Sequence, residues 1–377
     1  MAVKTVLLTL GRLPTAVDLA RSFKAAGWRV VVCDPFRWHL ARTSRCVDAV
    51  VQVPAPATDQ QGFLEALLAA IDTWSVDLVV PVSEETMFVA ALMQRLPPGV
   101  QLFCREQQHV LQLHSKLQFA RLADSVGLAV PQTVAMTSAA AADLLAAHPC
   151  VIKPEFSCAG RGIHFTTPQH ALPTVDDRDS LVQRRIAGEE FSAFAIARHG
   201  EVLGIVIYRS MVRLNQVAVA FERVEQPSIA EWVTHFIAAV SHHGLVSFDF
   251  IVDSDGQAHA IECNPRATSG LHFFTRESLG ASIATGSTPE LRDERQLQEF
   301  WSTWTHWFVS LGAPAERRRT GRAIRQCRDV TWRLRDPGVF LLATFSTWPI
   351  ISRARRNRFD FASAAAKDIE WQSGYGD

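Results

Sequence analysis

Three oxygen-bearing side chains between residues 247 and 270 have a spacing suited to binding a metal ion: Asp249, Glu262 and Asn264. An Asp-Gly pair at 255–256 lies between two apolar-rich runs and predicts a two-residue hairpin turn, because Asp and Gly tolerate positive φ. Counting outward from this turn places Asp249 directly opposite Glu262, with Asn264 two residues later on the same face. Oxygen ligands of this kind suit Mg²⁺, with phosphate oxygens and water completing the octahedron.

The same register predicts that Ile251 pairs with Ala260 and that the opposite face of the hairpin packs on a core. Two facing carboxylates about 4 Å apart repel each other by roughly 1–4 kcal/mol, so this pairing requires a cation or a proton. A surface hairpin with solvated acids is the alternative interpretation. The residues expected on the core-facing side are Phe248, Phe250, Val252, Ile261 and Cys263.

Two lysines have positions that set them apart from ordinary surface lysines. Ser115 and Gln118 form a capping box, which places Lys116 in the first turn of a helix, where a cation opposes the helix dipole. Lys153 ends a predicted strand that begins at residue 150, and a glycine-containing loop able to present backbone N–H groups to phosphate oxygens follows it. The residues of interest in that loop are Ser157, Gly160 and Gly162.

A third segment, residues 181–191, reads as a strand that runs into a glycine turn, with a further strand after it. The end of such a strand can offer backbone hydrogen bonds to an adenine and a carboxylate to a ribose. The candidate adenine contacts are Gln183, Arg184, Arg185 and Ile186, and the candidate ribose contact is Glu190.

The first 112 residues predict an open parallel α/β sheet, beginning with a strand at 3–9, a helix at 15–26 and a strand at 28–33. The first turn lacks the G-x-G-x-x-G pattern of dinucleotide-binding sites, which argues against a nicotinamide cofactor. A strand at 78–82 runs into Glu84 and Glu85. These acids either meet a substrate amine in the crevice beyond the strand or stabilise a helix N-terminus.

The composition of the chain bears on its partners and on the cellular compartment that we expect for it. Among 377 residues, Lys plus Arg and Asp plus Glu both number 38, so overall charge gives no argument for binding nucleic acid or a membrane surface. Seven cysteines without a C-x-x-C pair predict reduced thiols and a cytoplasmic location. Neither a signal peptide nor a membrane span is predicted.

The order of these motifs along residues 1–290 resembles the ATP-grasp superfamily, most specifically in the pattern D-x12-E-x-N-P-R that ends at Arg266. The resemblance implies a fold in which two α+β subdomains clamp ATP. It implies that Lys116 and Lys153 bind phosphate, that residues 157–162 form a mobile lid loop, and that Gln183 to Ile186 and Glu190 bind adenosine. The implied magnesium ligands are Asp249, Glu262 and Asn264.

The chain departs from the D-alanine ligases, which carry an Arg where this chain has Ser247. The Asn-Pro-Arg form resembles instead that of carbamoyl phosphate synthetase and biotin carboxylase. Arg266 is then the residue that stabilises the acyl phosphate and the tetrahedral intermediate. Dipeptide-forming ligases share the same form, so bicarbonate chemistry is not implied.

The activity implied by the resemblance is ATP-dependent ligation of a carboxylate to an amine through an acyl phosphate, with release of ADP and phosphate. Lys153 and Arg266 are the candidate catalytic residues. One or two Mg²⁺ ions, replaceable by Mn²⁺, accompany ATP. The expected partners are a small carboxylate and an amine, and a homo-oligomer is compatible with the pattern. A non-catalytic nucleotide-binding regulatory module, a kinase and carbamoyl-phosphate-like chemistry are the alternatives.

The loop after Arg266 combines backbone N–H groups, hydroxyls and an imidazole, which suit a small amino-acid-like substrate. The substrate candidates are Glu84, Ser269, Gly270 and His272.

The expected organisation is an N-terminal domain (1–112), a lid subdomain (113–185), a catalytic subdomain (186–290) and a helical C-terminal extension (291–377). In the extension, an apolar helical face from Phe300 to Leu311 predicts core packing against the preceding domain. Between residues 316 and 358 the sequence has twelve Arg and three acids. This basic run is expected first to cover acidic surface; an anionic substrate or a protein partner are the alternatives.

Overall fold

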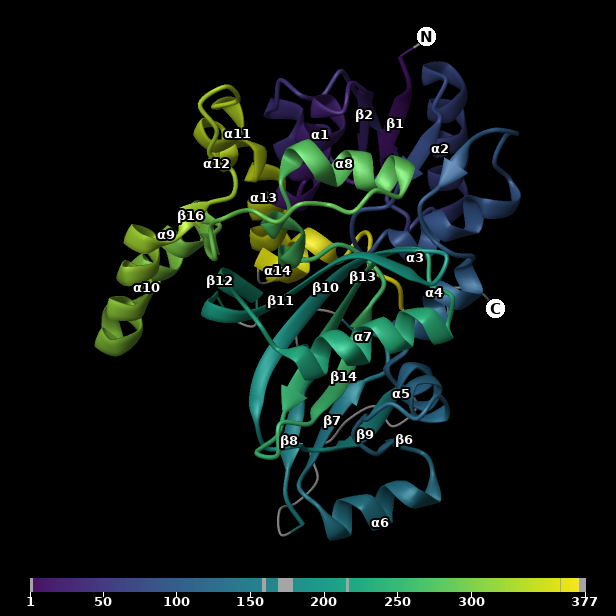
Figure 1. Ribbon diagram of the computed structural model, residues 1–377. Helices are drawn as coiled ribbons and strands as arrows, with labels where there is room; N and C mark the ends of the chain where they lie inside the picture. The colour runs from purple at the N-terminus through teal and green to yellow at the C-terminus, as the bar shows by residue number, and fades with distance from the viewer. Residues whose placement is uncertain (1–2, 158–160, 169–178, 215–216, 360, 373–377) are drawn as a thin grey trace.

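The computed structural model describes residues 3–157, 161–168, 179–214, 217–359 and 361–372. The parallel N-terminal sheet, the seven-stranded sheet and the four-stranded sheet follow one another along the molecule, and the helical C-terminal region lies beside the first two (Figure 1). This arrangement confirms the predicted fold class, a parallel α/β domain followed by α+β subdomains and a helical extension.

The N-terminal sheet is parallel, with strand order β3-β2-β1-β4-β5. Its central strands are nearly all apolar, as expected where helices cover both faces of a parallel sheet. The strands are β1 (Thr5–Leu8), β2 (Arg29–Asp34), β3 (Ala49–Gln52), β4 (Leu78–Val80) and β5 (Gln101–Leu102). The helices are α1 (Pro14–Ala25), η1 (Leu40–Thr43), α2 (Gln60–Trp74), α3 (Thr86–Val89), η2 (Ala90–Gln94) and α4 (Gln107–His114).

A four-stranded antiparallel sheet, order β6-β9-β7-β8, forms the opposite end of the molecule with α6 (Figure 1). Helix α5 enters this part of the fold, and its N-cap Ser115 accepts a hydrogen bond from the Gln118 N–H at 3.1 Å, as the capping pattern predicts. The elements are α5 (Lys116–Ser125), β6 (Thr133–Ala135), α6 (Ala139–Ala147), β7 (Cys150–Pro154), β8 (His164–Thr166) and β9 (Ser180–Arg184).

The largest sheet has the order β14-β13-β10-β11-β12-β15-β16. Helices α5 and α7 pack on one of its faces, where Phe119, Trp232, Phe236, Phe248 and Phe250 form an aromatic cluster. The elements are β10 (Glu189–Arg198), β11 (Glu201–Leu214), β12 (Val217–Val224), α7 (Pro227–Ala239), β13 (Gly244–Val252), β14 (Ala258–Asn264), η3 (Ser269–Phe273), α8 (Arg276–Thr285), β15 (Gln296–Gln298) and β16 (Arg328–Asp329).

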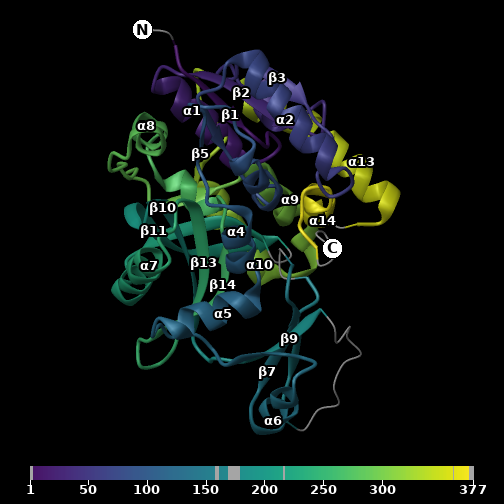
Figure 2. The same ribbon diagram turned by 90° about the vertical axis from the view of Figure 1, so that its right-hand side faces the viewer.

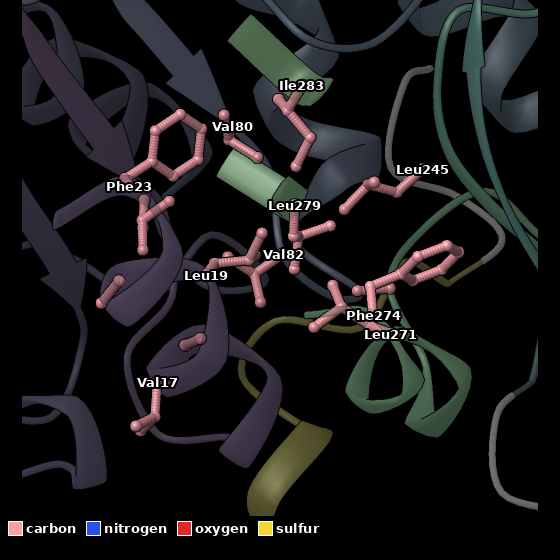
Figure 3. Close-up of a cluster of buried hydrophobic side chains, with 14 of the residues drawn as sticks. Val17, Leu19, Phe23, Val80, Val82, Leu245, Leu271, Phe274, Leu279 and Ile283 are labelled. Carbon is pink, nitrogen blue, oxygen red and sulfur yellow. The ribbon is translucent and has the colours of Figure 1, made fainter. Parts of the chain in front are cut away.

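The N-terminal domain and the large sheet share one hydrophobic core. Figure 3 shows Leu19 of α1 beside Val82, with Leu279 and Ile283 of α8 above them and Leu271 and Phe274 to the right, all within one buried cluster. Gly280 of α8 lies so close to the backbone of α1 that a Cβ there would approach the Phe23 nitrogen to 2.8 Å. The β4 end and the η3 segment are therefore held by packing in a fixed relation to each other.

The C-terminal region closes back onto the N-terminal domain through buried ion pairs. Arg12 contacts both Asp34 and Asp368 at 2.8 Å, and Arg21 contacts Asp336 at 2.9 Å. The helices of this region are α9 (Phe300–Val309), η4 (Ser310–Gly312), α10 (Pro314–Gln326), α11 (Gly338–Leu341), α12 (Ala343–Ser346), α13 (Trp348–Asn357) and α14 (Phe361–Ala366).

The predicted core packing of the apolar face on α9 is wrong for Trp304, Phe308 and Leu311, which are exposed. The buried residues of α9 are Thr303 and His306. Thr303 Oγ1 donates to the Val219 carbonyl at 3.1 Å, so the helix rests on β12 through its polar side. The aromatic rings instead stack along the helix on one another.

Candidate functional site

The hairpin of β13 and β14 differs from the predicted register at its turn. Asp253 N–H donates to the Gln257 carbonyl at 3.1 Å, which makes the loop three residues long with Gly256 at φ +81°. The Asp253 carboxylate accepts from the N–H groups of Asp255 and Gln257, which stabilises the longer turn. The predicted two-residue turn and the pair Ile251–Ala260 are therefore wrong.

A β-bulge restores the register before the carboxylates are reached. Phe250 pairs with Ala260, whereas Asp249 pairs with Glu262, so Ile261 is the extra residue. Ile261 is only half-buried and does not join the core with Phe248, Phe250, Val252 and Cys263, contrary to the prediction. Its carbonyl accepts a hydrogen bond from Lys153 Nζ at 3.0 Å. The bulge thus places Asp249 opposite Glu262 and gives a buried lysine a partner.

Two lysines from different elements converge on Glu262. Lys116, the first residue of α5, has its Nζ 3.9 Å from a Glu262 carboxylate oxygen. The same Nζ donates to the Ser157 carbonyl at 2.9 Å and lies 3.2 Å from the Ser157 hydroxyl. Lys153, near the end of β7, is also buried. The site therefore gathers two cations beside two carboxylates in a protected position.

Burial and charge shift the pKa values of these groups in opposite directions. Burial and the neighbouring Glu262 raise the pKa of Asp249 to about 6. Burial alone would raise the Glu262 pKa, but Lys116 and Lys153 outweigh it and lower that pKa. Burial lowers the pKa of Lys153 to about 8, although Glu262 opposes this change. The arrangement is a cluster of two carboxylates and two lysines in which Asp249 is the group whose charged form burial disfavours.

Arg266 links this cluster to the N-terminal domain. One of its Nη atoms lies 2.7 Å from Glu84, in the segment between β4 and α3, and the same atom donates to Asn264 Oδ1 at 3.3 Å. His114 lies 3.9 Å from Glu84, and burial lowers the His114 pKa to about 3, so the imidazole is neutral. Glu84 therefore belongs to the same group of side chains. Glu85 instead accepts from Thr9 and from the amides of Val82 and Ser83, a structural role.

The loop after Lys153 is described at both ends. Ser157 contacts Lys116, and Gly162 has φ +69° with Pro154 so near that a Cβ would approach to 2.9 Å. Gly160 lies outside the described residues.

The segment expected to bind adenosine lies at the end of β9. Gln183 is buried and donates through Nε2 to the Thr133 hydroxyl at 3.0 Å. The backbone N–H groups of Arg184 and Arg185 donate to the carbonyls of Gln132 and Pro149, both at 2.9 Å. Glu190, on β10, is half-exposed and ion-paired with Arg213 of β11.

The loop after Arg266, which is expected to contact substrate, lies partly beside the carboxylates and partly in the core. Ser269 is half-buried after Thr268, whose hydroxyl lies 2.8 Å from Ser247 Oγ. Gly270 is buried, and a Cβ there would lie 2.4 Å from Phe194 Cβ, so packing accounts for this glycine. His272 Nδ1 lies 2.8 Å from Asp18 Oδ2 on α1, which turns this ring toward the domain interface rather than toward the carboxylates.

Two features of the site have no counterpart in the sequence prediction. Ser192 of β10 donates to Asp249 Oδ1 at 2.7 Å, which only the pairing of β10 with β13 brings about. The chain end also reaches this region, since Glu370 pairs with Arg161 of the glycine loop and Trp371 packs on Phe88 of α3. No local motif marks residues 370–371, so only the tertiary structure identifies them.

A family model for the ATP-grasp domain matches residues 113–270. Residues 113–270 are an ATP-grasp domain. This match spans both lysines, the adenosine segment and the D-x12-E-x-N-P-R pattern.

Solved structures with this fold extend the likeness beyond the ATP-grasp domain. The N5-carboxyaminoimidazole synthetase of Staphylococcus aureus complexed with ADP has 16% identity, with a TM-score of 0.60 over 76% of this chain and 80% of its own. The L-amino acid ligase of Bacillus licheniformis has 18% identity, a TM-score of 0.57 and 78% coverage of both chains. The biotin carboxylase of Campylobacter jejuni has 16% identity and a TM-score of 0.59 over 78% of this chain and 72% of its own. At these identities the likeness establishes the fold.

The side chains of the ATP-grasp domain fit a magnesium ion. The metal-facing atoms that Asp249, Glu262 and Asn264 offer are oxygens, and burial, followed by the neighbouring Glu262, raises the pKa of Asp249, so a cation there would favour its charged form. Among the described residues there is no group of three His, Cys, Asp or Glu side chains placed for a metal ion. A pair of carboxylates with an amide therefore needs phosphate oxygens or water as further ligands.

In the part of the chain that the structure describes, no helix is both long and apolar enough to cross a lipid bilayer.

Proposed function

We propose that the protein is an ATP-dependent ligase that joins a carboxylate to an amine through an acyl phosphate and releases ADP and phosphate. The observation that carries the proposal is that Lys116 lies 3.9 Å from Glu262, opposite Asp249, and that Lys153 binds the carbonyl of the adjacent Ile261 and adds its charge beside Glu262. Phosphoryl transfer requires little beyond positioning and charge stabilisation, and this cluster supplies both in a buried setting.

The two lysines would bind the phosphates of ATP from two sides. Lys116 reaches from the start of α5 and Lys153 from β7, so a triphosphate between them would bridge two separate elements. Asp249, Glu262 and Asn264 would hold Mg²⁺, which neutralises phosphate charge and orients the γ-phosphate when bound. Ile186 follows the two amides that are already occupied and is the candidate N–H donor to adenine, with Glu190 on the ribose.

The first step would be attack by a carboxylate oxygen of the acid substrate on the γ-phosphorus, with ADP as the leaving group. The amine would then attack the acyl carbon, losing a proton as phosphate departs. Arg266 would stabilise the oxyanion at that carbon, and its ion pair with Glu84 fixes its position. Glu84, buried at the end of β4, would face the amine and favour its approach.

An amino acid is the substrate class we favour for at least one partner. The support is the hydroxyl-bearing loop beside Arg266 and the fold shared with an L-amino acid ligase. Ser269 is the substrate contact retained from the loop. We assign His272 and Gly270 to packing, because their described contacts are with Asp18 and Phe194.

A phosphate-release screen of amino acids, alone and in pairs, with mass spectrometry of the positive reactions, tests the proposal. Hydroxylamine added to the reaction should trap the acyl phosphate as a hydroxamate. A stable phosphorylated product would indicate a kinase, and nucleotide binding without turnover would indicate a regulatory module. Activity with bicarbonate and ammonia but with no acid–amine pair would indicate carbamoyl-phosphate-like chemistry.

A further inference from the structure

The helices α11, α12 and α13 form an almost continuous helical run from residue 338 to 357 with an exposed apolar side. Leu341, Phe345 and Trp348 follow one another at helical spacing, and their exposed fractions are 59%, 74% and 58%. Leu342 is exposed beside them. Solvent exposure of this many large apolar side chains on one short helical run indicates a binding surface.

The opposite side of this run is fixed in the protein. Val339, Ala343, Ser346 and Ile350 are buried, and Val339 and Ala343 belong to the core that contains α1. Gly338 lies so close to the Thr43 carbonyl that a Cβ would approach to 2.6 Å. Because the inner side is anchored by packing, the apolar side cannot turn inward.

Arginines flank the apolar residues along the chain, and the guanidinium of Arg355 lies 5.9 Å from the centre of the Trp348 ring. Arg335, Arg355, Arg356 and Arg358 are exposed, while the acid in the stretch 334–358, Asp336, is buried against Arg21. The run therefore presents tryptophan, phenylalanine and leucine together with exposed positive charge. We call these four arginines, with Leu341, Leu342, Phe345 and Trp348, the basic apolar surface.

From this combination we propose that the basic apolar surface docks the protein on an anionic lipid bilayer. Helices that lie in the membrane interface combine leucine and aromatic side chains with arginines that reach lipid phosphates. A second copy of the chain is a poorer partner, because a self-paired contact would bring the same arginines together. A partner protein with a neutral apolar groove is also a poorer fit, because it would offer no negative charge to these arginines.

The position of the surface is compatible with catalysis on a bilayer. Helices α11 and α12 lie at the end of the molecule away from α6 (Figure 1), and α13 lies along its outer edge (Figure 2). Docking by these helices would leave the four-stranded sheet (β6-β9-β7-β8) on the side away from the bilayer, so ATP could still reach the proposed site. Membrane attachment is thus independent of the proposed ligase chemistry and is tested separately from it.

The experiment is flotation of the purified full-length protein with vesicles of phosphatidylcholine, with and without phosphatidylglycerol. We expect binding to the anionic vesicles only, weakened by added salt. Arg355→Gln with Arg356→Gln should lower the partition coefficient about 30-fold, since each arginine contributes about fivefold. Leu341→Ser with Phe345→Ser should lower it at least about tenfold, because less apolar area enters the interface.

Matched controls carry the same changes elsewhere in the extension. Arg318→Gln with Arg319→Gln removes equal charge from exposed positions on α10, and Val309→Ser with Leu311→Ser removes exposed apolar side chains near η4. These pairs should retain binding, and all four variants should keep the wild-type melting temperature and vesicle-free nucleotide turnover. Absence of flotation, equal binding to neutral vesicles, or equal loss in the controls would each overturn the proposal. Self-association abolished by Leu341→Ser with Phe345→Ser, without vesicle binding, would identify a second copy as the occupant instead.

Discussion

Asp249 and Glu262 lie directly opposite each other on β13 and β14 although the turn that joins these strands is one residue longer than the sequence predicts. The bulge at Ile261 compensates for the longer turn, and it also turns a carbonyl to Lys153. The pairing of the two carboxylates is therefore maintained by a local irregularity of the strand. Bulges near active sites commonly re-aim side chains in this way.

Replacing Asp249 by Asn should stabilise the protein in the absence of metal and nucleotide. The Asp249 pKa is raised from its usual value near 3.8 to about 6, so the neutral form is favoured in the folded state. The cost of its charge is absent below about pH 4, grows between pH 4 and 6, and is complete above pH 6. At pH 7.5 we expect Asp249→Asn to raise the free energy of unfolding by up to about 2 kcal/mol and the melting temperature by a few degrees. At pH 4 we expect no effect. Calorimetry in chelator at the two pH values measures this, and an equal shift at both would show that charge is not the cause.

Replacing Lys153 by Met should strongly slow ADP formation while leaving the fold intact. The methionine keeps most of the apolar stem but removes the charge, which should lower the turnover number by about 10²–10³-fold. Because burial already lowers the Lys153 pKa, loss of the ammonium should leave the melting temperature unchanged or higher. Lys24→Met, at an exposed lysine of α1, is the matched control. Wild-type turnover in Lys153→Met would remove this lysine from the phosphate site.

The nucleotide product should be ADP. Both lysines and the facing carboxylates form one cluster, which suits phosphates held for attack at the γ-phosphorus. Chromatography of the nucleotide after turnover identifies the product. Stoichiometric AMP and pyrophosphate would contradict the acyl-phosphate pathway.

Breaking the contact between Arg12 and Asp368 should destabilise the N-terminal domain. Both side chains are buried, and removal of one partner from a buried pair costs about 3–5 kcal/mol; Asp34 also pairs with Arg12 and should keep the loss near the lower end. Asp368→Ala should therefore lower the midpoint of urea denaturation clearly. Glu225→Ala, which breaks an exposed pair with Arg295, should change it little.

Removal of all residues after 291 should give insoluble protein, because Leu297, Val330 and Ile369 belong to the core of the N-terminal domain. A soluble and active truncated protein would contradict this packing role.

The parts of the fold that local patterns determine could be predicted. The capped start of α5 places Lys116, and the alternation along β13 and β14 places Asp249 and Glu262 on one face. The turn itself could not be predicted, because the Asp253 side chain stabilises a longer loop than the Asp-Gly pair indicates. The prediction missed one extra residue in the turn and one extra residue at the Ile261 bulge. Because the two shifts in register cancel, Asp249 still pairs with Glu262.

Other parts depend on distant segments. The imidazole of His272 is a side chain suited to contacting a substrate, but its hydrogen-bond neighbour is Asp18, 254 residues away in the sequence. The apolar side of α9 lacks the expected partner because the helix packs through Thr303 and His306. Glu370 reaches Arg161 only after the whole extension has folded back. Helical periodicity identifies an apolar side but does not say what covers it.

The pair between Arg12 and Asp368 joins residues 356 positions apart, so it has a consequence for synthesis on the ribosome. At elongation rates of about 5–20 residues per second, Arg12 emerges roughly 20–70 s before Asp368 is made. During that interval the first sheet of the nascent chain lacks part of its core and one carboxylate for its arginine. The growing chain therefore exposes surface that a chaperone can recognise until Asp368 leaves the exit tunnel.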